Sequence, residues 1–167
     1  MKKKSFSIPK AKGFDRVVEI LALAIVLTMI IVPIVLYSSL PERIPSHYNI
    51  AGEIDSYNSR SSVFILPVIC LLVYLPITIL QCFPHLYNFP VEVTEENAED
   101  LYSIAIRLIR CMKLLVIFVF ALLFAETILC AFNIQHGKFV FWVLYGIDII
   151  LFPLILFWGI KKMKRVA

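Results

Sequence analysis

Four long apolar runs, separated by polar segments, dominate the pattern of this chain. The runs cover residues 17–37, 63–83, 112–132 and 139–160. Because a helix needs roughly 20 apolar residues to cross a hydrocarbon core of about 30 Å, each run is long enough to span a membrane. The pattern therefore predicts an all-α integral membrane protein with four transmembrane helices, folded as one membrane domain over residues 1–167.

The composition supports this class of protein. Hydrophobic residues make up 60% of the 167 residues, and the mean hydropathy is +0.88. The first run follows a basic segment, as a signal peptide would, but it is longer than the usual apolar region of about 7–15 residues. No pattern of small residues typical of a cleavage site follows Tyr37. We therefore interpret this run as a retained helix.

The distribution of positive charge predicts the orientation. Thirteen of the 16 Lys and Arg residues lie in the N-terminal segment, the connection over 84–113 and the C-terminal tail. Positive residues concentrate on the cytoplasmic side of membrane proteins. We therefore expect both termini in the cytoplasm, and the loop over residues 38–62 on the extracytoplasmic side.

The loop over residues 38–62 has the features of a hairpin. Pro41 and Pro45 remove backbone donors and end the first helix. Residues 47–50 and 53–57 flank Ala51 and Gly52, and Gly52 can adopt the positive φ that a tight turn requires. An isolated hairpin is marginally stable in water, so we expect it to pack on the helix ends.

The same loop carries a spaced motif at Leu40, Pro41, Ile44, Pro45, His47, Asn49, Gly52 and Asp55. This motif closely resembles the signature of the small bacterial membrane domain found at the N-terminus of SdpI-like immunity proteins. The resemblance covers residues 17–83 and implies a location in the bacterial cytoplasmic membrane. SdpI-like proteins continue into a further multi-span region, which the chain after residue 90 does not match. The chain thus resembles a stand-alone member, and immunity to a membrane-active toxin is what the resemblance implies for the full-length proteins.

The motif residues His47, Asn49, Gly52 and Asp55 are the predicted binding residues of the loop. We expect them to contact an extracytoplasmic ligand, either a membrane-active peptide or another membrane protein. His47 with Glu42, Glu53 and Asp55 could instead ligate a divalent metal, but the spacing does not establish converging ligands. A lone histidine among acids on a loop is more often a hydrogen-bonding residue, so no metal site is predicted.

A pair of acids lies deep within two of the predicted spans, Glu126 in the third and Asp148 in the fourth. A charge at mid-membrane costs roughly 2.5–3.5 kcal/mol, so such acids face the bundle interior or a partner. Their expected depths differ by only about 3 Å, and Tyr145 shares a helix face with Asp148. The three residues form either a proton or ion site, or hydrogen bonds that fix helix packing. The first reading gives the alternative function, a small proton- or cation-linked transporter.

The connection between the second and third spans changes character near Thr94. Thr94 is a good N-cap, acidic residues follow it, and Leu101, Ile104 and Leu108 repeat at helical spacing. We predict an interfacial helix over residues 95–111 that runs on into the third span.

Several classes of function have no visible basis in the sequence. The four cysteines lie within or at the ends of the apolar runs, and no CxxC pair occurs. Walker, GxGxxG, HExxH and GxSxG motifs are absent from the chain. We therefore predict no enzyme activity, no cofactor and no nucleic-acid partner. The lipid bilayer is the predicted environment, and the oligomeric state stays open.

Overall fold

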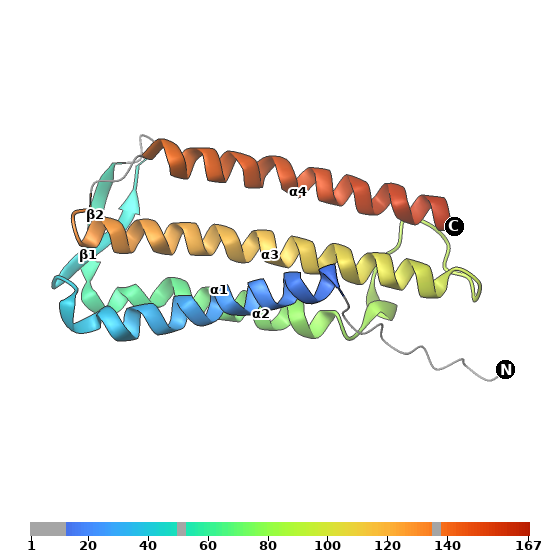
Figure 1. Ribbon diagram of the computed structural model, residues 1–167, viewed down its shortest axis with the longest axis horizontal. Coiled ribbons are helices and arrows are strands. Elements are labelled where there is room, and N and C mark those ends of the chain that lie inside the picture. Colours follow the sequence, from blue (N-terminus) through green and yellow to red (C-terminus); the bar gives the residue numbers. More distant parts are fainter. Residues whose placement is uncertain (1–12, 50–52, 135–137) are drawn as a thin grey trace.

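Four long helices run side by side in the computed structural model, and a short β-hairpin lies at one end of them (Figure 1). The structure describes residues 13–49, 53–134 and 138–167. The helices are α1 (Phe14–Leu36), α2 (Ile65–Leu80), α3 (Ala98–Ala131) and α4 (Lys138–Val166). Each is long and apolar enough to cross a membrane, and together they are the four such helices in the described ranges. The predicted four-span architecture is confirmed at this level, while its orientation stays a prediction.

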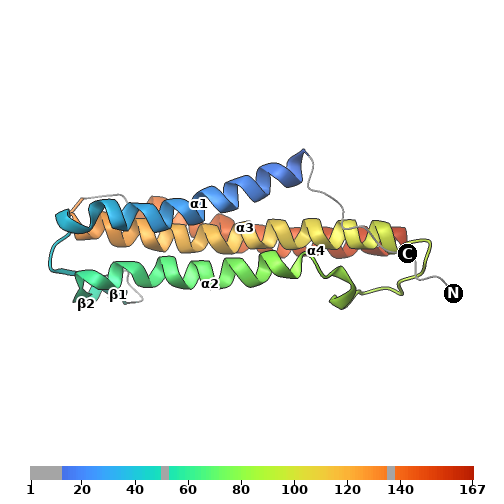
Figure 2. The same cartoon turned by 90° about the horizontal axis from the view of Figure 1, so that it is seen from below.

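Helix α3 is the centre of the bundle. It packs against α1 and α2 on one side and against α4 on the other. Figure 1 shows α3 between α4 and the α1–α2 layer, and in Figure 2 α1 and α2 lie on either side of α3, which overlaps α4 in that view. We call the end that carries the strands the hairpin end. At the opposite end α1 begins and α4 terminates, and we call it the far end.

The predicted interfacial helix and third span form one continuous element. At about 1.5 Å per residue, the 34 residues of α3 extend about 51 Å, well beyond a hydrocarbon core of about 30 Å. The predicted start of this helix at residue 95 is wrong, because α3 begins at Ala98 with Asn97 as its N-cap; Thr94 instead caps the preceding turn, where its Oγ1 accepts a hydrogen bond from the Asn97 backbone nitrogen, 3.3 Å away. Asn97 Oδ1 accepts in return from the Thr94 nitrogen at 2.8 Å, as in a capping box. This capped turn precedes the first helical residue, Ala98.

Asn133 ends α3 at the hairpin end. Its φ of 53° is the left-handed conformation that commonly follows a helix. The Ile134 nitrogen donates to the Leu129 carbonyl at 3.0 Å, and the Asn133 nitrogen donates to the Cys130 carbonyl at 3.0 Å. These two bonds form a Schellman motif, which satisfies carbonyls at the helix end.

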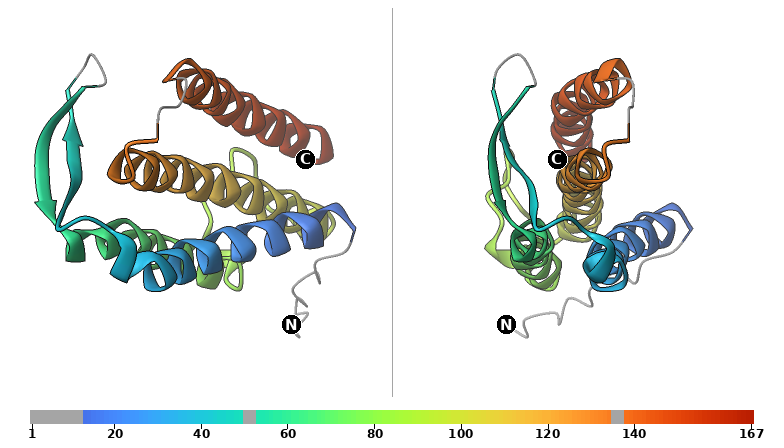
Figure 3. Two further views of the ribbon diagram at one scale, coloured as in Figure 1. Left: turned by 60° about the vertical axis from the view of Figure 1, so that its left-hand side comes forward. Right: turned by 90° about the vertical axis from the view of Figure 1, so that its left-hand side faces the viewer.

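The segment between α1 and α2 folds into short elements. After α1 come a 3₁₀ turn, η1 (Tyr37–Ser39), strand β1 (Arg43–Tyr48), strand β2 (Ile54–Ser59) and a second 3₁₀ turn, η2 (Arg60–Phe64). The strands pair antiparallel, with Arg43 opposite Ser59 and Tyr48 opposite Ile54. In Figure 3 the strands rise across the hairpin end from the α1–α2 layer toward the level of α4. A hairpin is therefore present, but β1 begins four residues earlier than the predicted 47–50 and includes Pro45, and β2 extends beyond the predicted 53–57. The predicted turn at Ala51 and Gly52 lies outside the described residues.

Two apolar clusters hold the bundle together. One joins α1, α2 and α3 to the base of the hairpin, and its buried members include Met29, Leu40, Ile44, Cys70 and Ile117. The other joins α3 to α4 at the far end, where Leu101, Ile104, Ala105 and Leu108 meet Met163. Helix α4 is held mainly by this contact with α3, since most of its apolar surface is exposed.

At Gly159, α4 packs closely against Leu108 of α3. A Cβ added at this residue would lie 2.8 Å from Cδ2 of Leu108, whereas a Cβ at Gly146 would meet nothing within 4 Å. Overpacking of this kind typically destabilises a fold by about 1–3 kcal/mol.

We predict opposite effects for two matched glycine substitutions in α4. Gly159→Ala should lower the unfolding temperature, because Leu108 must move, while Gly146→Ala should leave it unchanged or raise it through helix propensity, worth roughly 0.5–1 kcal/mol. Intrinsic fluorescence in detergent micelles measures both, since the two tryptophans, Trp142 and Trp158, lie on α4. Equal unfolding temperatures for the two variants would contradict the close packing at Gly159.

Candidate functional site

The base of the hairpin is anchored in the apolar core. Leu40, Ile44 and Val63 are at most 2% exposed and belong to the cluster shared with α1, α2 and α3. Arg60 ties the two sides of the base together. Its backbone nitrogen donates to the Glu42 carbonyl at 2.8 Å, and its guanidinium lies 5.7 Å from the Tyr37 ring centroid. The strands therefore extend from a base that is fixed to the helices.

His47 and Asp55 form an exposed side-chain contact across the strands. Nδ1 of His47 lies 2.6 Å from Oδ1 of Asp55, and the two side chains are 69% and 43% exposed. The pairing register shifts on each side of His47, so that Ser46 and Asp55 have no direct partner across the sheet. Such bulges re-aim side chains, and here the irregularity brings Asp55 onto the histidine.

Asn49 connects the ends of the two strands. Its backbone nitrogen donates to the Glu53 carbonyl at 2.9 Å, its Oδ1 accepts from the Glu53 nitrogen at 2.9 Å, and its Nδ2 donates to Glu53 Oε2 at 3.1 Å. Asn49 thus closes the hairpin immediately before its turn. Gly52, the remaining predicted binding residue, lies outside the described residues. Of the motif residues that are described, His47 and Asp55 are in contact, and Asn49 supports the loop that carries them.

The acids proposed as further metal ligands do not join this pair. Within residues 13–49, 53–134 and 138–167, no three His, Cys, Asp or Glu side chains come together in an arrangement that could hold a metal ion. Glu53 is engaged by Asn49, and Glu42 contributes its backbone carbonyl to Arg60. The arrangement offers one imidazole and one carboxylate for contact with a ligand.

Glu126, Tyr145 and Asp148 lie on two helices that pack together, α3 and α4. Glu126 and Tyr145 are close enough to interact electrostatically. Asp148 is 7% exposed although Ile147, Ile149 and Ile150 around it are between 48% and 71% exposed, so it faces the bundle. Its Oδ1 is buried and has no hydrogen-bond partner in the described part of the chain. A direct pairing of Glu126 with Asp148 stays a prediction.

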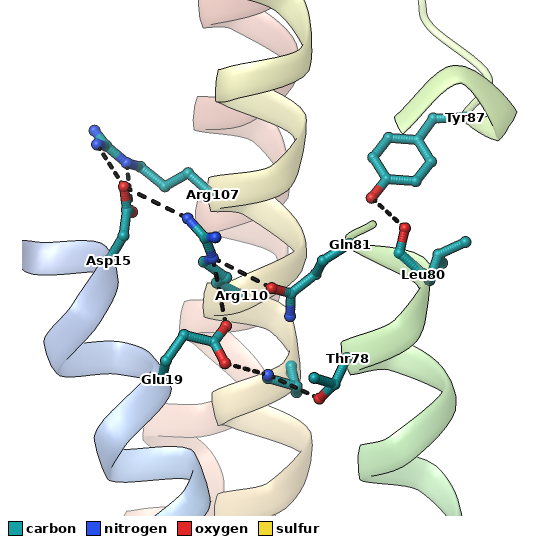
Figure 4. A network of polar contacts seen from close by, with 9 residues as sticks. Asp15, Glu19, Thr78, Leu80, Gln81, Tyr87, Arg107 and Arg110 are labelled. Atoms are coloured by element: carbon teal, nitrogen blue, oxygen red, sulfur yellow. Dashed lines mark hydrogen bonds and ion pairs between the residues drawn. The ribbon is translucent and has the colours of Figure 1, made fainter. Parts of the chain in front are cut away.

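The structure also contains a charged cluster that the sequence reasoning missed. We call it the inter-helix network; it joins α1, α2 and α3 toward the far end and consists of Asp15, Glu19, Thr78, Gln81, Arg107, Arg110 and Lys113. Figure 4 shows these side chains converging from the three helices. The sequence interpretation had treated its three basic residues only as orienting charges.

Two arginines of α3 contact the acids of α1. Nε and Nη2 of Arg107 donate to Oδ1 and Oδ2 of Asp15 at 2.8 and 2.9 Å, a two-pronged contact of high geometric specificity. Arg110 lies deeper, with its Nε 3.4 Å from Glu19 Oε1 and 3.2 Å from Gln81 Oε1. Arg110 therefore links all three helices.

Lys113 is the most buried member of the network. Its side chain is 0% exposed, and its ammonium donates to Glu19 Oε2 at 2.7 Å and to Thr78 Oγ1 at 3.0 Å. The same nitrogen lies 4.7 Å from the centroid of the Tyr74 ring, which adds a cation–π contact. A buried ammonium without such partners would be strongly destabilising.

Tyr87 closes the α2 side of this region. Its hydroxyl donates to the Leu80 carbonyl at 2.8 Å and so satisfies a carbonyl near the C-terminal end of α2 (Figure 4). Burial raises the pKa of Tyr87 to about 12. The phenol is therefore neutral at physiological pH and adds no negative charge to the network.

A sequence signal for the network did exist. Glu19 and Lys113 both fall inside the apolar runs over 17–37 and 112–132, where an isolated charge is expensive. Asp15 and Glu19 are four residues apart, so they share one helix face. Opposite charges within two different spans predict that the spans are neighbours, and this inference was available without a structure.

Comparisons with known proteins find matches to part of the chain. Residues 24–71 match the family model described as "Domain of unknown function (DUF1648)". An uncharacterized protein of Archaeoglobus fulgidus is 33% identical over 66 residues, a region that covers 35% of this chain and 36% of that protein. The chain thus matches about a third of the length of this relative. No solved structure matches it.

We predict that Lys113→Met alone destabilises the fold by about 3 kcal/mol, because it leaves the partly buried Glu19, 23% exposed, without its closest cation. The double variant Glu19→Leu/Lys113→Met should recover most of this loss, since replacing both partners of a buried pair is often neutral. Thermal unfolding of the wild type, both single variants and the double variant in one detergent gives the coupling energy. Additive losses would show that the contact does not hold α1 on α3.

Proposed function

We propose that this multi-pass membrane protein binds an extracytoplasmic ligand through the exposed hairpin face that carries His47 and Asp55, with a membrane-active peptide as the leading ligand class. The four helices serve as the scaffold that holds the hairpin at the membrane surface. The observation that carries the proposal is the His47–Asp55 pair, at 2.6 Å and largely exposed.

The construction of the hairpin supports a binding role. Every residue of β2 after Ile54 is exposed, whereas the base is buried through Leu40 and Ile44. Because the base is fixed to the helices, the strands need little further backbone ordering when a partner binds their exposed polar side chains. Since solvent surrounds the pair, a cationic group of a ligand can replace His47 as the partner of Asp55, and a carboxylate of a ligand can replace Asp55 as the partner of His47.

The charge distribution supports the extracytoplasmic placement. By their place along the chain, only three of the 16 Lys and Arg residues fall on the side that carries the hairpin, and two of them are Arg43 and Arg60 at its base. The other 13 fall on the opposite side, as the positive-inside rule requires if the hairpin is extracytoplasmic. The matched family region, residues 24–71, also includes the whole hairpin. The proposed activity therefore lies in the part of the chain that the family model covers.

We infer a second candidate function, proton or cation handling at Asp148 with Glu126 and Tyr145. It is favoured by one observation, the buried Oδ1 of Asp148 that lacks a hydrogen-bond partner in the described part of the chain. A carboxyl group in an apolar setting without a hydrogen bond is best accommodated by a proton or a bound cation. Transport through α3 and α4 would use this group, whereas ligand binding at the hairpin would not.

The hairpin proposal predicts loss of protection in a survival assay. A strain that lacks the protein and carries the His47→Ala/Asp55→Ala variant should be about tenfold more sensitive to a membrane-active peptide than one carrying the wild type, since a hydrogen bond to a charged group is worth roughly 1.5–3 kcal/mol. Asn58→Ala, an exposed change on β2 outside the motif, is the matched control and should protect fully. The assay is repeated with several membrane-active peptides, and if the wild type protects against none of them, the peptide-binding proposal is wrong.

The transport proposal predicts the opposite pattern of damage. Glu126→Gln/Asp148→Asn should preserve the unfolding temperature, because both changes retain size and remove a buried charge, yet abolish proton or cation flux. Proteoliposomes that contain a pH-sensitive dye measure this flux directly, with His47→Ala/Asp55→Ala as the control that keeps it. Undiminished flux in the Glu126→Gln/Asp148→Asn variant, or no flux in the wild type, would exclude these two carboxyls as a transport site.

A further inference from the structure

Gln81 has a buried donor without an acceptor. Its side chain is 6% exposed, and Nε2 makes no hydrogen bond in the part of the chain that the structure describes. The two ends of the amide cannot simply be exchanged, because Oε1 already accepts from Arg110 Nε at 3.2 Å. A buried N–H group left unpaired costs about 1–3 kcal/mol, so this position calls for an acceptor from outside the chain.

Arg110 offers further donors next to this amide. Its side chain is 9% exposed, and its Nη1 lies 3.8 Å from Asp15 Oδ2, beyond hydrogen-bond distance. Its Nε is occupied by Gln81, and the outer edge of the guanidinium makes no hydrogen bond among the described residues. In Figure 4 the Gln81 amide lies beside the Arg110 guanidinium on the α2 side of the network.

The inter-helix network has an excess of positive charge. Arg107, Arg110 and Lys113 face two carboxylates, those of Asp15 and Glu19, which leaves a surplus of one positive charge. Arg107 is 40% exposed and holds Asp15 most closely, whereas the buried Arg110 and Lys113 share Glu19. Because buried charges are stable when they are paired, a further negative partner beside Arg110 would be favourable, in addition to the missing acceptor at Gln81.

The depth of the network indicates where that partner comes from. Lys113 precedes the last residue of α3, Ala131, by 18 residues, which corresponds to about 27 Å of helix. Glu19 precedes the last residue of α1, Leu36, by 17 residues, or about 26 Å. Because these lengths are slightly less than the roughly 30 Å thickness of the hydrocarbon core, we place the network near the edge of the core opposite the hairpin, within reach of the lipid headgroups.

We propose that Gln81 and Arg110 bind the phosphate group of an anionic phospholipid at this boundary. A phosphate offers several acceptor oxygens in different directions, so one group can accept from Gln81 Nε2 and from the free edge of Arg110. It also supplies a negative partner beside Arg110. Lys113 is saturated by Glu19, Thr78 and the Tyr74 ring, so it contributes charge and no direct contact. This site is independent of the hairpin function proposed above.

The isosteric variant Gln81→Glu tests the site. Glutamate keeps an acceptor for Arg110, removes the Nε2 donor and cancels the surplus charge, so the variant should fold at least as well as the wild type in phosphatidylcholine and detergent. Added phosphatidylglycerol should raise the unfolding temperature of the wild type on the order of 5 °C at saturation, and should have little effect on Gln81→Glu. Asn58→Asp makes the same amide-to-acid change at the hairpin end and should keep the full shift.

One further variant and one further ligand separate the possible explanations of the shift. Gln81→Met removes the donor without adding charge, so it should also lose the shift, and it serves if Gln81→Glu does not fold. Inorganic phosphate, added in phosphatidylcholine micelles, should give no shift; a shift that depends on Gln81 would assign the oxyanion site to a soluble phosphate and overturn the lipid assignment. Equal phosphatidylglycerol shifts in the wild type and in both Gln81 variants would overturn the site itself and attribute the effect to the exposed basic residues.

Discussion

The contact between Lys113 and Glu19 constrains the rest of the bundle. A fully buried ammonium must be paired, and the 2.7 Å contact with Glu19 together with the bond to Thr78 brings α1 and α2 to the same level of α3. With that level fixed, the apolar residues of the three helices toward the hairpin end come into register. The buried cluster of Met29, Cys70 and Ile117 is the result.

The two polar regions of the protein are separated by the length of a membrane span. The hairpin rests on the core through Ile44, and the inter-helix network lies about 27 Å along α3 from the hairpin end. The apolar helix faces between them carry few polar groups, so each region meets a different side of the bilayer. With this separation, the proposed ligand site at the hairpin and the proposed lipid site at the network would act independently.

Helix α4 is held differently from the other three. It packs mainly on α3, with Gly159 against Leu108 and with Asp148 buried on the side that faces the bundle. A helix with one main neighbour can shift with less loss of contact than α3, which has three. Asp148, whose Oδ1 has no hydrogen-bond partner among the described residues, thus lies on the helix with one main neighbour.

The sequence by itself determined the local features of this protein. Four spans follow from the length of the apolar runs, the capped turn before α3 follows from Thr94, and the hairpin follows from the prolines and the turn residues, because each depends on residues near one another in the chain. Only the tertiary structure decided which charges meet. Asp15 and Arg107 are 92 residues apart, and Glu19 and Lys113 are 94 apart. A hydropathy average over a span hides such single charges. In the hairpin, a bulge brings Asp55 to His47, which the alternation of side chains along a strand does not predict. The free energy of pairing appears only when the helices come together.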